Sequence, residues 1–181
     1  PTIYQPVGTK SWYVGIGVVL RSKPAAATPW TIVQRGHLGG GAGANLHWDI
    51  QYDSVTATNP NGAWIFRMYD STTPALISFE IADGDGGTTP IDQYRFVEMW
   101  FEGVGTTVFK GNVYKDDDTV TAGSSGATIT GQNTTTEDMT IGVSKSAAAT
   151  IGTVFADISV CEFRYGKSEN AAVALMQASD T

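Results

Sequence analysis

Apolar residues recur along the chain in runs of strand length, and clusters of Gly, Pro, Asn, Asp and Thr separate these runs. The clearest run covers residues 46–52, where Leu46, Trp48, Ile50 and Tyr52 alternate with polar side chains, so one face of this strand is expected to be buried. The same signal predicts strands over residues 11–21, 30–35, 46–52, 63–69, 75–81, 94–101, 107–114, 139–143 and 158–165. Short strands at this spacing are typical of a β-sandwich or barrel.

Two pairs of these strands are predicted to form hairpins. Residues 63–69 and 75–81 both alternate with a period of two and are joined by a short polar turn. Residues 94–101 and 107–114 are joined by a turn that offers Gly103 and Gly105 where a positive φ is needed.

Two further stretches are not predicted to be core strands. Residues 116–138 are too poor in apolar side chains for a core element, so we expect loops there, with room for an edge strand. The one predicted helix covers residues 168–176, because Ser168 can cap it, Glu169 suits its first turn, and good helix formers follow.

Length and composition place these strands in one all-β domain. The chain has 181 residues, of which 41% are hydrophobic and only 16% charged, so neutral Thr, Ser, Asn and Gly must cover much of the surface. That mixture favours strands and turns over water-facing helices. We therefore expect a single domain over residues 1–181, with an N-terminal arm at 1–10 and a C-terminal tail at 177–181.

Charge and hydropathy exclude two classes of partner. The net charge of −7 and the absence of Lys/Arg clusters argue against nucleic acid as a partner. No apolar stretch approaches the roughly 20 residues of a membrane span, so we expect no membrane insertion. No basic start precedes an apolar run, so the sequence encodes no signal peptide, although a signal cleaved before Pro1 or a removed initiator Met would give the same start. Cys161 is the only cysteine, which excludes an internal disulfide; inside a predicted core strand it is expected to be a small buried residue.

Several segments, in the right order, resemble the LamG-like, concanavalin A-like jelly-roll superfamily. Residues 92–103 resemble the W-H-x-V-A-x-x-Y-D-G strand and turn of that superfamily, with Tyr94 where Trp is usual, and residues 106–116 resemble the strand that follows. Residues 155–166 are similar to its closing strand, and residues 11–21 with 31–36 to its opening strands.

The resemblance implies two antiparallel sheets packed face to face, with alternating apolar residues filling the interior. It does not imply one function, because the superfamily includes lectins, carbohydrate-binding modules, glucanases, adhesion domains and virion proteins.

Catalytic residue patterns are missing from the sequence. The Glu-x-Asp-x-Glu string of a retaining glucanase does not occur, and of Glu98 and Glu102 the second falls in a turn, so Glu98 is expected to be an edge or rim carboxylate. His37 and His47 have no ligand-spaced partners and are expected to be solvated strand residues. We therefore predict a protein that is not an enzyme.

Two features could bind a ligand. The first is a set of acidic loop residues that could offer oxygens to Ca²⁺, although Asp-Gly strings are also plain turns; apart from calcium, no cofactor is predicted. These candidate metal ligands are Asp83, Asp85, Asp116, Asp117 and Asp118. The second is aromatic: most of the five tryptophans should be core, but a sugar ring can stack on an exposed one. The candidate carbohydrate-binding residues are Trp30, His47, Trp48 and Asp49.

These observations favour a non-catalytic structural or binding protein. The first hypothesis is a bacteriophage virion surface subunit, a capsid decoration or cement protein or a tail fibre, because the chain begins at Pro1 without a signal peptide and has low-charge loops and no disulfide. Its partners would be other virion proteins or copies of itself, and it would reach the virion after synthesis in the host cytoplasm. The alternative is an extracellular, carbohydrate-binding lectin-like module that binds cell-surface glycans.

Overall fold

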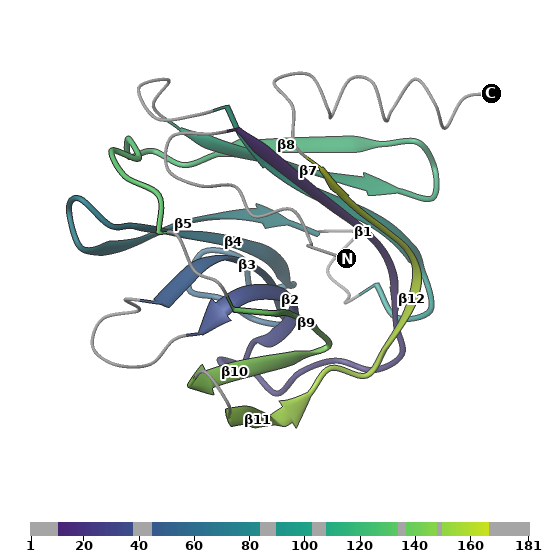
Figure 1. Ribbon diagram of the computed structural model, residues 1–181. Helices are drawn as coiled ribbons and strands as arrows, with labels where there is room; N and C mark the ends of the chain where they lie inside the picture. The colour runs from purple at the N-terminus through teal and green to yellow at the C-terminus, as the bar shows by residue number, and fades with distance from the viewer. Residues whose placement is uncertain are drawn as a thin grey trace.

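The computed structural model is an all-β sandwich built from two five-stranded antiparallel sheets (Figure 1). It describes residues 11–37, 45–83, 90–102, 108–133, 137–147 and 150–166. The strands are β1 (Trp12–Leu20), β2 (Trp30–His37), β3 (Asn45–Asp53), β4 (Ala63–Asp70), β5 (Ala75–Ala82), β6 (Tyr94–Phe101), β7 (Phe109–Lys115), β8 (Val120–Ser124), β9 (Met139–Ile141), β10 (Val143–Ala147), β11 (Thr150–Phe155) and β12 (Ile158–Gly166).

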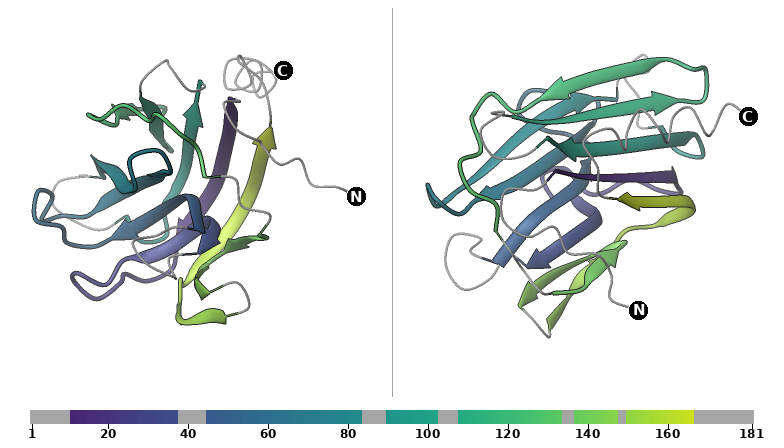
Figure 2. Two further views of the ribbon diagram at one scale, coloured as in Figure 1. Left: turned by 60° about the vertical axis from the view of Figure 1, so that its left-hand side comes forward. Right: turned by 45° about the horizontal axis from the view of Figure 1, so that its top comes forward.

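Sheet A has the strand order β12-β1-β6-β7-β8, and sheet B has the order β5-β4-β3-β2-β9. Strands β10 and β11 form a separate two-stranded sheet beside β2. The first and the last described strands are neighbours, since β1 pairs with β12 along its length, and the two run side by side in both views of Figure 2. Strands from opposite ends of the described chain therefore lie next to each other in sheet A.

The core lies between the two sheets and follows the period of two. Every second residue of β1 from Trp12 to Leu20 is buried and belongs to one core cluster with apolar side chains of β2, β3 and β4. The indole ring of Trp12 in sheet A stacks on that of Trp48 in sheet B, with their ring centroids 5.4 Å apart. Burial of such large side chains, each worth about 1.5–3 kcal/mol, is the main force that holds the sheets together.

Most of the strand predictions are confirmed. Both predicted hairpins form, as β4 with β5 and β6 with β7. The polar stretch 116–138 contains one short strand, β8, at the edge of sheet A. Strands β10 and β11 were not predicted, because neither shows a sustained alternation of apolar and polar residues.

Some predictions fall on residues outside the described ranges. The predicted helix at 168–176, the N-terminal arm at 1–10 and the tail at 177–181 all lie there. Within the described ranges the chain forms no helix, and so none that is long and apolar enough to span a membrane.

Three predictions about exposure were wrong. The side chains of His37 and His47 are buried, and Cys161 is exposed. His47 lies on β3, the middle strand of sheet B, where neighbouring strands and the segment around Gln132 cover it. Cys161 lies on β12, at the edge of sheet A, beside an irregularity in the pairing with β1. The position of the strand in its sheet, rather than the residue type, decides exposure in these cases.

Candidate functional site

The outer face of sheet A, which points away from the core, carries an unusual set of aromatic side chains. On β6 the residues Val97, Met99 and Phe101 fill the core, so the alternate positions point outward. The outward aromatic side chains of β1, β6 and β7 are Tyr13, Tyr94, Phe96, Trp100 and Tyr114, and we call this set the aromatic face. A sheet face that met only water would carry polar side chains instead.

Glu98 lies at the centre of the aromatic face and is completely buried. Its Oε1 accepts hydrogen bonds from the Tyr114 hydroxyl and from the Asn112 amide, both at 2.7 Å. The prediction that Glu98 is an edge or rim carboxylate is therefore wrong, because β6 is the middle strand of sheet A. Among the described residues, its Oε2 has no partner with hydrogen-bond geometry.

The two tyrosines beside Glu98 stay protonated over the whole physiological pH range. Burial, followed by the negative charge of Glu98, raises the pKa of Tyr13 above its usual value. Burial and the hydrogen bond to Glu98 raise the pKa of Tyr114 in the same way. Both groups therefore remain neutral hydroxyls that can donate to the carboxylate.

Gly15 in β1 leaves room for the side chains of Tyr13 and Phe96 on the aromatic face. A Cβ atom at Gly15 would lie 2.5 Å from the Tyr13 hydroxyl and 2.6 Å from Cζ of Phe96, closer than side chains can approach. Because Gly15 has no side chain, Phe96 can lie over β1 and reach Arg164 on β12. The guanidinium of Arg164 lies 5.0 Å from the centre of the Phe96 ring, which is a cation–π contact.

Gly17, two residues further along β1, likewise leaves room for side chains of the neighbouring strands. A Cβ atom at Gly17 would lie 2.7 Å from the Tyr94 hydroxyl and 2.7 Å from Cγ of Glu162. The Tyr94 hydroxyl donates to Glu162 at 2.5 Å across this gap, and Arg164 donates to the other oxygen of the same carboxylate at 2.8 Å. Side chains of β6 and β12 are thus joined across β1.

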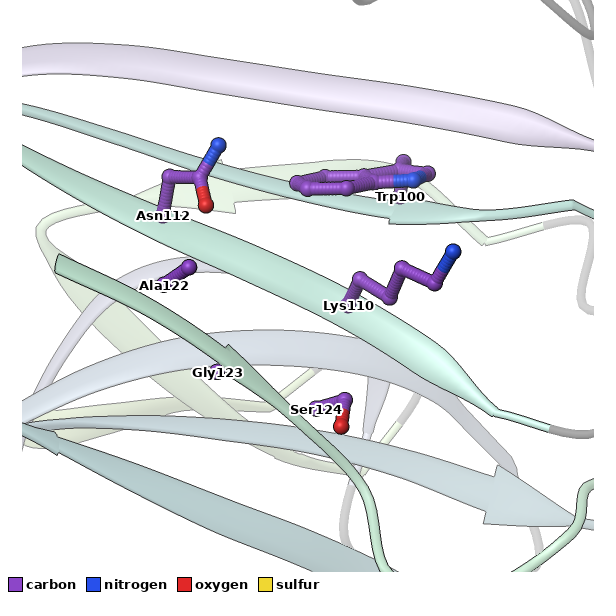
Figure 3. Close-up of a pocket in the computed structure, with 6 residues that line it drawn as sticks. All are labelled: Trp100, Lys110, Asn112, Ala122, Gly123 and Ser124. Carbon is purple, nitrogen blue, oxygen red and sulfur yellow. The ribbon is translucent and has the colours of Figure 1, made fainter. Parts of the chain in front are cut away.

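The aromatic face opens to solvent at the end where β6, β7 and β8 meet. A shallow, open hollow of about 480 Å³ lies there, within the size range of small-molecule sites. Figure 3 shows Trp100, Lys110 and Asn112 on the same side of the sheet. The residues that line the hollow are Trp100, Lys110, Asn112, Ala122, Gly123 and Ser124.

Glu102 positions two of the lining side chains. Its Oε1 accepts hydrogen bonds from Lys110 Nζ at 2.8 Å and from the indole N–H of Trp100 at 3.4 Å. The hydrogen bond from Lys110 lowers the pKa of Glu102, so this carboxylate is ionised at neutral pH. Glu98 lies four residues away, about 13 Å along an extended strand. That separation exceeds the roughly 5–9.5 Å between the carboxyl groups of glycosidases.

The four predicted carbohydrate-binding residues lie elsewhere, on sheet B. Trp30, His47, Trp48 and Asp49 are all buried, with Trp48 stacked in the core. Asp49 forms a two-pronged ion pair with Arg67, one bond of which is 2.7 Å long. The described surface therefore does not present these residues to a ligand.

Of the predicted metal ligands, Asp83 and Asp116 both contact Arg95. Asp83 is buried and accepts hydrogen bonds from Trp64 Nε1 at 2.7 Å and from Arg95 Nε at 2.9 Å, so its carboxylate has a structural role. Asp116 lies 3.5 Å from Nη1 of the same Arg95, and more than half of its side chain is exposed.

Of the other three acidic residues, the structure describes Asp117 and Asp118, which lie between β7 and β8. Asp117 accepts a hydrogen bond from the backbone N–H of Thr119, and Asp118 has a φ of 64°, as is common in a tight turn. Asp85 lies outside the described residues. In the part of the chain that the structure describes, no three His, Cys, Asp or Glu side chains are grouped to hold a metal ion. Calcium binding at these loops stays a prediction.

The sequence did contain a signal for the aromatic face. Strand β6 carries apolar or aromatic residues at both parities, with Val97 and Met99 on one side and Phe96 and Trp100 on the other. A strand that is apolar on both faces is buried on both or has a partner on one.

Comparison with known proteins identifies a fold but no family. No protein-family model and no curated protein match the chain. Among solved structures, it is similar to the crystal structure of the botulinum neurotoxin serotype G binding domain, with a TM-score of 0.51 and 11% sequence identity. The match covers 94% of this chain and 37% of that chain, and at this identity it shows a shared fold alone.

Proposed function

We propose that this protein is a non-catalytic binding module with a lectin-like fold, and that it holds a saccharide on the aromatic face of sheet A. The observation that carries the proposal is the partly exposed Trp100 beside Lys110 and Asn112, over the open hollow. An indole offers a flat apolar surface to the C–H face of a sugar ring, while an amide and an ammonium group bind its hydroxyls.

The polar groups of the hollow are already oriented. The Asn112 amide nitrogen donates to Glu98 at 2.7 Å and to the Tyr114 hydroxyl at 3.1 Å, while its amide oxygen has no hydrogen bond among the described residues. Asn112 is thus fixed with an acceptor left for a sugar hydroxyl. Because these side chains stand on paired strands, little conformational entropy would be lost when a ligand binds.

The test is a glycan array followed by titration of the sugars that bind. We expect Trp100→Ala to weaken binding of such a sugar by about tenfold or more, and Asn112→Ala to weaken it as well. The matched control is Phe155→Ala, which removes a more exposed aromatic side chain from β11, outside the aromatic face. A blank array, or sugar binding that survives Trp100→Ala, would show that the proposal is wrong.

A virion surface subunit is the second candidate. It is supported by the exposed apolar side chains of β11, which include Phe155 with an exposed fraction of 66% and Ile151 with 57%. Apolar side chains gathered on one exposed strand are common where proteins attach to one another. This candidate predicts that the chain sediments with large particles from its source, and that Phe155→Lys releases it. Sedimentation only as free protein would count against it.

A further inference from the structure

Strand β12 forms an open edge of sheet A. It is nine residues long, it pairs with β1 on one side, and no strand in the described ranges pairs with its other side. Val160 and Phe163 on this edge have exposed fractions of 44% and 39%. A long edge with exposed apolar residues is a template for pairing with another strand.

The charges on β12 are arranged for pairing with a second copy of the same strand. Glu162 and Arg164 flank Phe163 and both point to the outer face of sheet A, where they bond to each other at 2.8 Å. If two copies pair antiparallel about a two-fold axis at Phe163, each Glu162 lies opposite the Arg164 of the other copy.

Shifting the two-fold axis by one residue in either direction would place like charges opposite each other. Residues directly opposite each other must point to the same face of the sheet. The two-fold axis must therefore lie midway between the two copies of one residue. An axis at Glu162 would place two carboxylates opposite each other, and an axis at Arg164 would place two guanidinium groups opposite each other. Like charges in such positions are destabilising. We propose that two copies of this chain pair through β12 with the two-fold axis at Phe163.

This pairing would join two five-stranded sheets into one continuous sheet. An axis perpendicular to the sheet keeps both aromatic faces on the same side, so the dimer presents them together. The Phe163 side chains, which are partly exposed in one copy, meet at the axis and become shielded from water. Two copies would pair in this way whether or not the aromatic face binds a saccharide.

The oligomeric state tests the proposal, measured by sedimentation and light scattering over a range of concentrations. We expect the wild-type chain to be a dimer, and Phe163→Lys, which places two ammonium groups at the axis, to raise the dissociation constant by at least about tenfold. The control Leu76→Lys makes a similar change at an exposed apolar residue of β5 in sheet B and should leave the dimer intact. A monomeric wild type, or a dimer that Leu76→Lys dissociates and Phe163→Lys does not, would overturn the proposal.

The single cysteine tests the register. In this dimer Cys161 lies two positions from the axis in each copy, so the two thiols are four residues apart, about 14 Å. A bis-maleimide of that span should cross-link them, whereas mild oxidation should not form a disulfide. Ready formation of a disulfide would instead place the axis at Cys161 and contradict the proposed register.

A charge swap provides the second check on the register. Arg164→Glu alone should weaken the dimer, because it places carboxylates opposite each other. The double variant Glu162→Arg, Arg164→Glu should restore it. Failure of the double variant to dimerise, although it unfolds at the same urea concentration as the wild type, would contradict the pairing of these two residues.

Discussion

The buried His47 should make the protein lose stability in mild acid. Its imidazole has an exposed fraction of 1%, lies 3.1 Å from Gln132 Oε1, and meets the edge of Trp12 at a centroid distance of 5.5 Å. Burial lowers the pKa of His47 to about 4, against the opposing effect of the Gln132 hydrogen bond. The folded protein therefore keeps this histidine neutral at a pH where the unfolded chain protonates it.

The size of the effect follows from the two pKa values. In the unfolded chain the pKa of a histidine is about 6.5. Between that value and about 4, the unfolded state binds a proton that the folded state does not, so the free energy of unfolding falls as the pH falls. At 1.36 kcal/mol per pH unit, the loss amounts to about 3 kcal/mol over this window. That is a large part of the roughly 5–15 kcal/mol that stabilises a typical domain.

The assay is urea unfolding of the wild type and of His47→Gln at about pH 7, 6, 5 and 4.5. The variant cannot take up the proton, so between pH 7 and pH 4.5 its stability should fall by about 2.5 kcal/mol less than that of the wild type. Other titrating groups, such as the buried Asp49, are the same in both proteins and cancel in the difference. If the two stability curves run parallel from neutral to acid pH, the reasoning about His47 is wrong.

Two further changes test the packing of the sandwich. The buried Asp70 accepts hydrogen bonds from the backbone N–H groups of Thr130, Thr72 and Thr73. These bonds outweigh the effect of burial and lower the pKa of Asp70. Asp70→Asn should therefore cost about 1–3 kcal/mol of unfolding free energy at neutral pH. This penalty should shrink below about pH 4, as the wild-type carboxylate is protonated. If urea unfolding shows the same penalty in acid as at neutral pH, the role assigned to the Asp70 carboxylate is wrong. Gly111→Ala should cost about 1–3 kcal/mol, because the new Cβ would lie 2.8 Å from the Phe66 ring and 2.9 Å from a backbone oxygen. The control Gly126→Ala meets nothing within 4 Å, so equal thermal stability of the two variants would contradict this account.

The strands and hairpins of this protein could be predicted because they depend on neighbours in sequence. The alternation of Trp48, Ile50 and Tyr52 needs only a pleated backbone to place all three on one face. The same local rule predicted the hairpin of β6 and β7, which lie close together in sequence. The weak patterns of β10 and β11 gave no such signal, and these strands were missed.

The candidate site could not be predicted in the same way, because it depends on which strands become neighbours. Trp48 and Asp49 looked like ligand-binding residues in sequence, but sheet B buries them between other strands. Tyr94 and Glu162 are far apart in the chain, and they meet only because β1 lies between β6 and β12.

The sequence by itself determined the all-β class, most of the strands and the face on which each apolar residue lies, because a period of two is a property of the extended backbone. The tertiary structure decided which strands are central and which lie at an edge. That choice buries the carboxylate of Glu98 in the middle of sheet A and exposes the thiol of Cys161 at its rim. The physical reason is that water is excluded by strands brought together from distant parts of the chain, and no local pattern records which strands those are.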